Sequence, residues 1–201
     1  EYFIRGVATR YNAVNPNAAA PLGEMPYETR IVVRRPIDPQ RFGGVVVVDW
    51  QNVTAGHDID TEWGGSGDFF VRHGWIWVGA SVQRVGVNGA TTGATANFGL
   101  KQWSPSRYAP PDLTNGSTVL DDSQSYDVYT QIARLVRQGP SSGPNPFAGL
   151  DVRDVYAGGV SQSATFLIRY YNAIQAAARA YDGFLVGLGG GVPRSDIGTK
   201  L

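Results

Sequence analysis

The fold of this chain is decided by the stretch Val155-Tyr156-Ala157-Gly158-Gly159-Val160-Ser161-Gln162-Ser163-Ala164-Thr165. An apolar run leads into a Gly-x-Ser-x-Ser turn at residues 159–163, and a helical pattern follows at once. A strand that turns sharply into a helix through one serine is the layout of a nucleophile elbow, which lifts that serine above the edge of a parallel sheet. The pattern therefore predicts Ser161 as a candidate nucleophile.

Small residues around Ser161 fit such a turn. Gly159 lets the backbone pass close to the following helix, and we expect Ser161 to adopt a strained conformation. The backbone N–H of Gln162 has no partner within its own helix and is predicted to stabilise an oxyanion, although an ordinary first helical residue is the alternative. Ser163 is expected to be a packing residue or a hydrogen-bond donor at the helix start rather than a catalyst.

Strands and helices alternate outward from this turn. We predict strands over residues 2–9, 27–35, 45–50, 75–81, 151–157 and 182–188, and helices over 68–73 and 162–180. A further helix is expected to start at caps among residues 121–123 and to end at Gly139, with loops over 12–26, 84–118 and 140–149. The alternation predicts one domain, residues 1–201, with a doubly wound, mostly parallel α/β sheet covered on both faces.

The composition excludes several classes of function. The 17 basic residues balance the 17 acidic ones, which gives no electrostatic reason to expect nucleic acid or an anionic membrane as a partner. No apolar run approaches the ~20 residues of a membrane span. Because the chain has no cysteine and two histidines, neither a metal nor a cofactor is expected. Low lysine and absent cysteine favour a secreted or periplasmic protein, with a cytoplasmic one as the alternative.

Two further regions are candidates for the site. The loop after the strand at 45–50 is expected to supply a second oxyanion donor, from the backbone of Gln51 or of Asn52, unless it is a plain turn. The long segment 84–118 carries Phe98, Trp103 and Tyr108, which are candidates for an apolar wall around the substrate. Trp75 and Trp77 share one face of a strand, where packing is their expected role.

Several segments together resemble a bacterial family of alpha/beta hydrolase domain-containing proteins. They are residues 27–36, 41–42, 45–53, 74–79, 83, 85–87, 107–108, 125–127 and 159–164, and they run in family order over nearly the whole chain. The resemblance implies an α/β-hydrolase fold with Ser161 as the nucleophile, acting on a small or polymeric carboxylic ester or a related acyl substrate. It also implies that family members continue through further strands that carry a catalytic acid and a histidine.

Here the chain departs from the family, because no histidine follows Ser161. Two aspartates follow Ser161: Asp182 is expected to be a surface carboxylate, and Asp196 lies in the terminal tail. If His57 were the catalytic histidine, the catalytic residues would follow an order along the chain that this fold does not use. His57 is therefore expected at the rim of a pocket, whereas His73 is expected to stabilise a helix end. We therefore expect the acid and the base to come from a second segment or chain that completes the fold. The alternative is a non-catalytic binding or assembly module with Ser161 idle.

Overall fold

The computed structural model describes residues 1–15, 17–90 and 98–189. Six strands form one mixed sheet in the order β1-β2-β4-β3-β5-β6. They are β1 (Tyr2–Asn15), β2 (Ala18–Arg34), β3 (Val45–Trp50), β4 (Ile76–Ala80), β5 (Asp154–Val160) and β6 (Gly183–Gly187). The pairings among β4, β3, β5 and β6 are parallel, and β1–β2 and β2–β4 are antiparallel. The predicted mostly parallel α/β sheet is confirmed.

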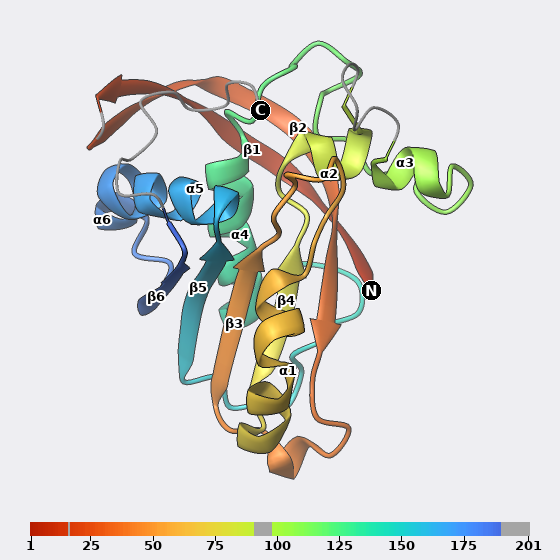
Figure 1. Ribbon diagram of the computed structural model, residues 1–201, viewed down its shortest axis with the longest axis vertical. Coiled ribbons are helices and arrows are strands. Elements are labelled where there is room, and N and C mark those ends of the chain that lie inside the picture. The colour runs from red at the N-terminus through yellow and green to blue at the C-terminus, as the bar shows by residue number, and fades with distance from the viewer. Residues whose placement is uncertain (16, 91–97, 190–201) are drawn as a thin grey trace.

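Helices cover both faces of this sheet (Figure 1). They are α1 (Thr61–His73), α2 (Arg84–Asn88), α3 (Leu100–Trp103), α4 (Ser125–Gln138), α5 (Gln162–Tyr170) and α6 (Ala176–Ala178), with a 3-10 turn η1 (Pro39–Arg41) and a π-helical turn η2 (Tyr171–Gln175). In Figure 1, α1 crosses in front of β3 and β4, whereas α4 lies behind the sheet. Such two-sided cover explains why β3 begins with four valines and is buried along its whole length.

The side chains of β3 alternate between two cores. Val46, Val48 and Trp50 join the larger core with residues of α4 and α5, and all three are fully buried. Val45 and Val47 face α1 in a smaller core with Phe70 and Trp77. Burial of each such side chain contributes ~1.5–3 kcal/mol. Trp75 packs against the smaller core, so the expected packing role of both tryptophans is confirmed.

The predicted loop at residues 12–26 is wrong, because β1 and β2 continue through it as a long hairpin. Pro21 pairs with Tyr11, and Pro26 pairs with Val7. A proline is tolerated here because β2 pairs with β4 over residues 31–34 alone, which leaves its other side unpaired near both prolines. The hairpin extends beyond the sheet and over α5 (Figure 1).

The helices differ from expectation in three places. α1 begins at Thr61 rather than at residue 68, because Trp63 packs on Trp77 with ring centroids 5.9 Å apart. The N-cap of α4 is Gln124, which makes no side-chain cap bond. The carboxylate of Asp122 instead accepts a hydrogen bond from Arg84 N at 2.8 Å. Segment 84–118, predicted as irregular, contains the short helices α2 and α3.

Candidate active site

Ser161 is the single residue between β5 and α5. Its φ of 60° and ψ of −115° place it in a region that favours glycine, and its side chain is exposed. A non-glycine residue in such a conformation costs about 1–3 kcal/mol, and such strain is concentrated at functional sites. The Ser161 N–H donates to Gly187 O at 2.8 Å, which fixes the turn against the end of β6.

The neighbours of Ser161 leave no room for larger residues. A Cβ on Gly159 would lie 3.0 Å from Leu167 Cδ1 and 3.1 Å from Ser163 Oγ. Ser163 Oγ accepts from Val160 N and donates to Val160 O, each at 3.0 Å. Its expected role at the start of the helix is therefore confirmed.

The loop after β3 lies against the Ser161 turn, as the parallel topology predicts. Asn52 Nδ2 donates to Val160 O at 2.9 Å, and Val53 N donates to Gln162 Oε1 at 3.3 Å. The Asn52 side chain also accepts from Thr54 N at 2.9 Å, which orders the loop itself. Asn52 and Gln162 thus converge with Ser161 at the carboxyl ends of β3 and β5.

Gln51, the other candidate donor, is engaged elsewhere. Its backbone N–H donates to Ala80 O at 3.3 Å and so continues the sheet. Its side-chain oxygen accepts from Arg30 Nη2 at 3.2 Å. The Gln51 N–H is therefore engaged in the sheet, and the Asn52 backbone pairs with Ile59 in an isolated antiparallel bridge, in which Ile59 N donates to Asn52 O at 2.9 Å.

A hydrogen-bond network around the buried Gln83 supports the same edge and was missed from the sequence. Gln83 Oε1 accepts from Trp50 Nε1 and from Gln162 Nε2, each at 3.0 Å. Gln83 Nε2 in turn donates to Asp122 Oδ2 at 3.4 Å. Burial raises the pKa of Asp122, although the Arg84 N–H acts in the opposite direction. These bonds hold the Gln162 side chain, and hence the start of α5, in one position.

A cavity of about 460 Å³ lies beside the loop after β3. Its walls are Phe98, Leu100 and Trp103 on the apolar side and Arg30, His57 and Asp58 on the polar side. Phe98 and Trp103, both predicted as wall residues, are 54% and 72% exposed. His57 lies at the edge of this cavity, as expected, and its Nδ1 donates to Ala55 O at 3.2 Å.

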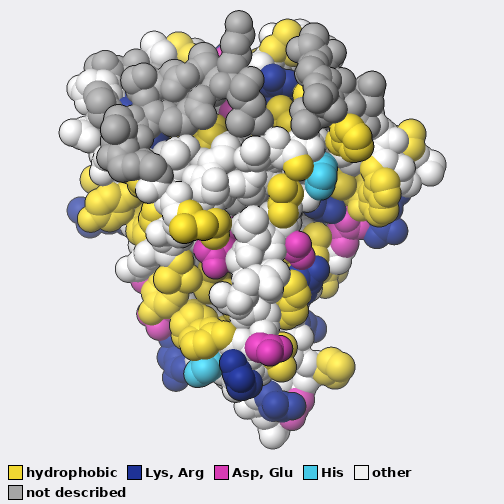
Figure 2. Space-filling view, viewed as in Figure 1, with side chains coloured by type: hydrophobic (Ala, Val, Ile, Leu, Met, Phe, Trp, Pro, Cys, Tyr) yellow, Lys and Arg dark blue, Asp and Glu magenta, His cyan; other side chains and the backbone are white. Residues whose placement is uncertain are grey.

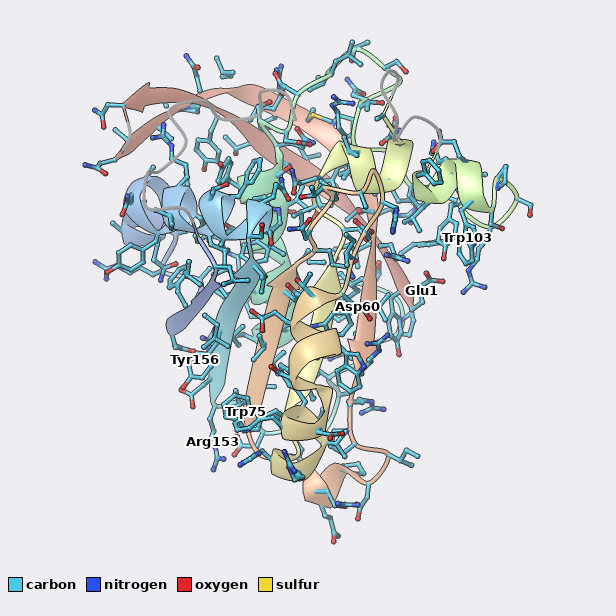
Figure 3. The ribbon with its side chains drawn as sticks, in the orientation of Figure 1. Glu1, Asp60, Trp75, Trp103, Arg153 and Tyr156 are labelled. Carbon is cyan, nitrogen blue, oxygen red and sulfur yellow. The ribbon has the colours of Figure 1, made fainter. Side chains whose placement is uncertain are left out.

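Tyr108, the third predicted wall residue, does not line this cavity. It is 2% exposed and packs on Phe3 and Trp103, with ring centroids 5.9 and 5.8 Å away. Its hydroxyl donates to Glu1 Oε1 at 2.7 Å. Tyr108 therefore belongs to the packing that supports Trp103; Glu1 and Trp103 are labelled in Figure 3 on the same side of the molecule.

Buried ionic groups form the polar side of the cavity. Arg30 Nη2 lies 2.8 Å from Asp58 Oδ2, and Ser81 Oγ donates to the same oxygen. Burial raises the pKa of Asp58, although Arg30 and the Ser81 hydroxyl lower it. The hydrogen bonds of Asp58 among the described residues go to Arg30 and Ser81, and none of them involves His57.

A pair of carboxyl groups, Asp49 on β3 and Glu62 on α1, was also missed. Asp49 is fully buried, and its Oδ2 accepts from Trp77 Nε1 at 3.2 Å. Burial raises its pKa well above the ordinary range, and the Glu62 carboxylate raises it further. Burial also raises the pKa of Glu62, although its hydrogen bond from the Gly159 N–H lowers it. Their sequence positions, on a strand and a helix, carry no pattern that would link them.

Neither a metal site nor a membrane helix is found among the described residues. No group of three or more His, Cys, Asp or Glu side chains there is arranged to hold a metal ion. Within the same ranges no helix has the length and hydropathy of a membrane span. Asp182 accepts hydrogen bonds from Val155 N and Arg137 at the amino-terminal end of β6, as expected of a surface carboxylate, and Asp196 lies outside the described residues.

The sheet order, the two-sided helical cover and the strand–serine–helix turn define an α/β-hydrolase-like protein. The chain belongs to the alpha/beta hydrolase domain family, whose family model matches residues 1–200. The resemblance found in the sequence is thereby confirmed, together with a hydrolase-type fold. No curated protein and no solved structure matches the chain.

Proposed function

We propose that this chain carries the nucleophile of a serine hydrolase that acts on carboxylic esters or related acyl substrates. The backbone of Ser161, with φ 60° and ψ −115° between β5 and α5, is the observation that carries the proposal. A strained, exposed serine at the carboxyl end of a central parallel strand presents its Oγ to solvent and its neighbouring helix N-terminus to a developing negative charge.

In this mechanism the Ser161 Oγ attacks the substrate carbonyl, and the carbonyl π bond opens to give an oxyanion. The N–H of Gln162 donates to that oxyanion, and the N–H of Asn52 is proposed as the second donor. Collapse of the tetrahedral intermediate expels the alcohol and leaves an acyl-serine, which water then hydrolyses. The Asn52–Val160 and Gln162–Gln83 hydrogen bonds keep both donors in place before the substrate arrives.

The attack also needs a base to take the serine proton. His73 ends α1, far along the chain from the Ser161 turn, and donates from Nδ1 to Phe69 O at 2.9 Å. The imidazole ring of His57 is held by the hydrogen bond from its Nδ1 to Ala55 O. We propose that a histidine and an acid from a segment outside this chain complete the site. Such a segment would pair with the outer edge of β6, where Leu185 and Val186 are 41% and 43% exposed.

The substrate body is proposed to enter the cavity beside His57. Phe98, Leu100 and Trp103 offer an apolar wall, and Arg30 and Asp58 offer fixed polar partners at its inner side. Binding sites for small molecules combine these two features, since apolar walls provide affinity and a few polar groups provide orientation.

Activity-based labelling tests the proposal. A fluorophosphonate probe, applied to the protein as its native cells produce it, is expected to form an adduct on Ser161 that mass spectrometry locates. Ser161→Ala should abolish both the adduct and ester hydrolysis, whereas Ser163→Ala should retain both. An active preparation labelled at another residue would refute the assignment, and an unlabelled, inactive one would favour a non-catalytic binding module.

His57→Ala separates the two sources of the base. If the base lies outside this chain, the variant should keep the labelling rate and change substrate preference at most. A loss of labelling in a folded His57→Ala protein would instead assign the base to His57.

A further inference from the structure

A second cavity, of about 750 Å³, lies at the opposite end of the molecule from Ser161. It opens between the end of α1 and the chain that links β2 to β3. Since Ser161 follows the carboxyl end of β5, and α1 runs back from that edge, the cavity lies at the amino ends of the parallel strands (Figure 1). The proposed hydrolase site does not use it.

Cationic side chains dominate this cavity. Four arginines line it, namely Arg34, Arg35, Arg41 and Arg72, together with His73 and one acidic residue, Asp38. Figure 2 shows the cationic side chains and the histidine gathered at this end, with acidic groups among them. The chain as a whole has a formal net charge of zero, so the lining of this cavity is more positively charged than the chain average.

Most of these charges form no ion pair with another described residue. Arg34 Nη1 pairs with Asp60 Oδ2 at 2.9 Å. In contrast, none of the ion pairs among the described residues involves Arg35, Arg41 or Arg72. The Asp38 carboxylate accepts from Gln40 N at 2.9 Å as a helix cap. Three guanidinium groups therefore remain available to a bound anion.

The walls of the cavity are held rigidly. The Arg34 guanidinium lies over Trp63 and Trp77, 4.6 and 4.8 Å from their ring centroids. Gly74 ends α1 with φ 64°, and a Cβ there would lie 1.9 Å from Arg41 O. Its carbonyl accepts from Gly43 N at 2.8 Å, which fixes the end of α1 against the β2–β3 connection. A preformed cavity loses little entropy when a ligand binds.

Apolar surface lies beside the charges. Trp63 and Trp75 line the cavity, and Ile37 and Val71 at its margin are 101% and 61% exposed. Figure 3 places Trp75 at this lower end of the molecule. A ligand for this cavity would gain from an apolar body as well as from an anionic group.

We propose that this cavity binds a phosphate monoester carried on a flat apolar body. Guanidinium groups match the oxygens of a phosphate through paired, charge-assisted hydrogen bonds, and a dianion suits several unpaired arginines better than a single carboxylate. The tryptophans would contact the apolar body. The site would lie at the far end of the sheet from Ser161, so it is a ligand site distinct from the proposed acyl site.

Titration calorimetry with 1-naphthyl phosphate tests this proposal. Wild-type protein should bind the probe saturably and more tightly than either inorganic phosphate or 1-naphthol. Arg72→Gln and Arg41→Gln should each weaken binding about tenfold or more, the size expected for loss of a hydrogen bond between charged groups. Arg134→Gln, which alters an exposed arginine of α4, should bind like wild type.

Hydrogen exchange gives a second measurement that needs no variant. The probe should slow exchange at residues 36–41 and 71–75 and leave the Ser161 turn unchanged. Absence of saturable binding, equal binding by Arg72→Gln and wild type, inorganic phosphate that binds as tightly as the probe, or protection elsewhere would each overturn the proposal.

Discussion

Asn52 and Val160 lie 108 positions apart in the chain and meet through one hydrogen bond, from Asn52 Nδ2 to Val160 O at 2.9 Å. The bond joins the loop after β3 to the last residue of β5, directly before Ser161. Asn52 is 4% exposed, and the same Val160 oxygen also accepts from Ser163 Oγ at 3.0 Å. The Ser161 turn is therefore tied to the loop after β3 by a side-chain amide.

Asn52→Asp should lower the free energy of unfolding by ~1–3 kcal/mol, because it removes the donor and places a buried carboxylate against the Val160 carbonyl oxygen. Urea unfolding followed by tryptophan fluorescence measures the change. Thr54→Ala, at an exposed position of the same loop, should shift stability by less than about 0.5 kcal/mol. Equal stability of Asn52→Asp and wild type would show that this hydrogen bond does not hold the loop.

The backbone strain at Ser161 predicts a difference between two substitutions. Ser161→Gly should unfold at a higher temperature than Ser161→Ala, by an amount equivalent to about 1 kcal/mol, because glycine relieves the positive φ that alanine retains. Both variants lack the hydroxyl, so the comparison isolates the backbone. Calorimetry that finds Ser161→Gly to be the less stable variant would contradict the strain.

Gly159 and Gly64 provide a matched pair of glycine-to-alanine substitutions. Gly159→Ala should destabilise the protein by about 1–3 kcal/mol, because the new Cβ would meet Leu167 Cδ1 at 3.0 Å and Ser163 Oγ at 3.1 Å. Gly64 lies within α1, and a Cβ added there would meet no other atom within 4 Å, so Gly64→Ala should stabilise by up to ~1 kcal/mol. Chemical unfolding of both variants checks the two signs together.

The buried Asp49 predicts a pH dependence of stability. Its folded-state pKa is raised well above the ordinary value of 3.8, so the folded protein binds this proton more readily than the unfolded chain. The free energy of unfolding should therefore fall as the pH rises from about 3.8 towards the folded-state pKa. Asp49→Asn should flatten that decline and stabilise the protein at neutral pH.

Unfolding measured from pH 4 to pH 8 tests this, with Asp68→Asn as the control at an exposed position. The control should keep the wild-type profile. An Asp49→Asn variant that is less stable than wild type at pH 8, with the same slope, would show that the carboxyl is ionised and favourable in the fold.

The parts of the fold that sequence reasoning predicts are those with local patterns. The four valines of 45–48 specify a strand buried on both faces, and Gly159 with Ser161 specifies the turn after β5. Because parallel strands end at one edge, the meeting of the loop at Asn52 with Gln162 follows from topology. The hairpin at residues 12–26 is not predictable in this way, because proline and alanine favour a loop unless one side of the strand is unpaired.

The side-chain networks of the site also lie beyond sequence reasoning. Gln83 meets Gln162 across 79 positions, and Arg30 meets Asp58 across 28, without any periodic signal. The early start of α1 depends on the packing of Trp63 against Trp77, which overrides the weak helix propensity of Gly64 and Gly65. Such contacts depend on the tertiary structure and leave no local pattern in the sequence.

The hairpin that extends over α5 has a consequence for synthesis on the ribosome. Tyr11 N donates to Ser123 O at 3.0 Å, and Arg169 Nη2 donates to Ala18 O at 3.3 Å across 151 positions. At translation rates of about 5–20 residues per second, the hairpin waits on the order of ten seconds for the segment it packs against. During that interval the hairpin lacks its contact with α5, and its strand edges are exposed to pairing with other chains.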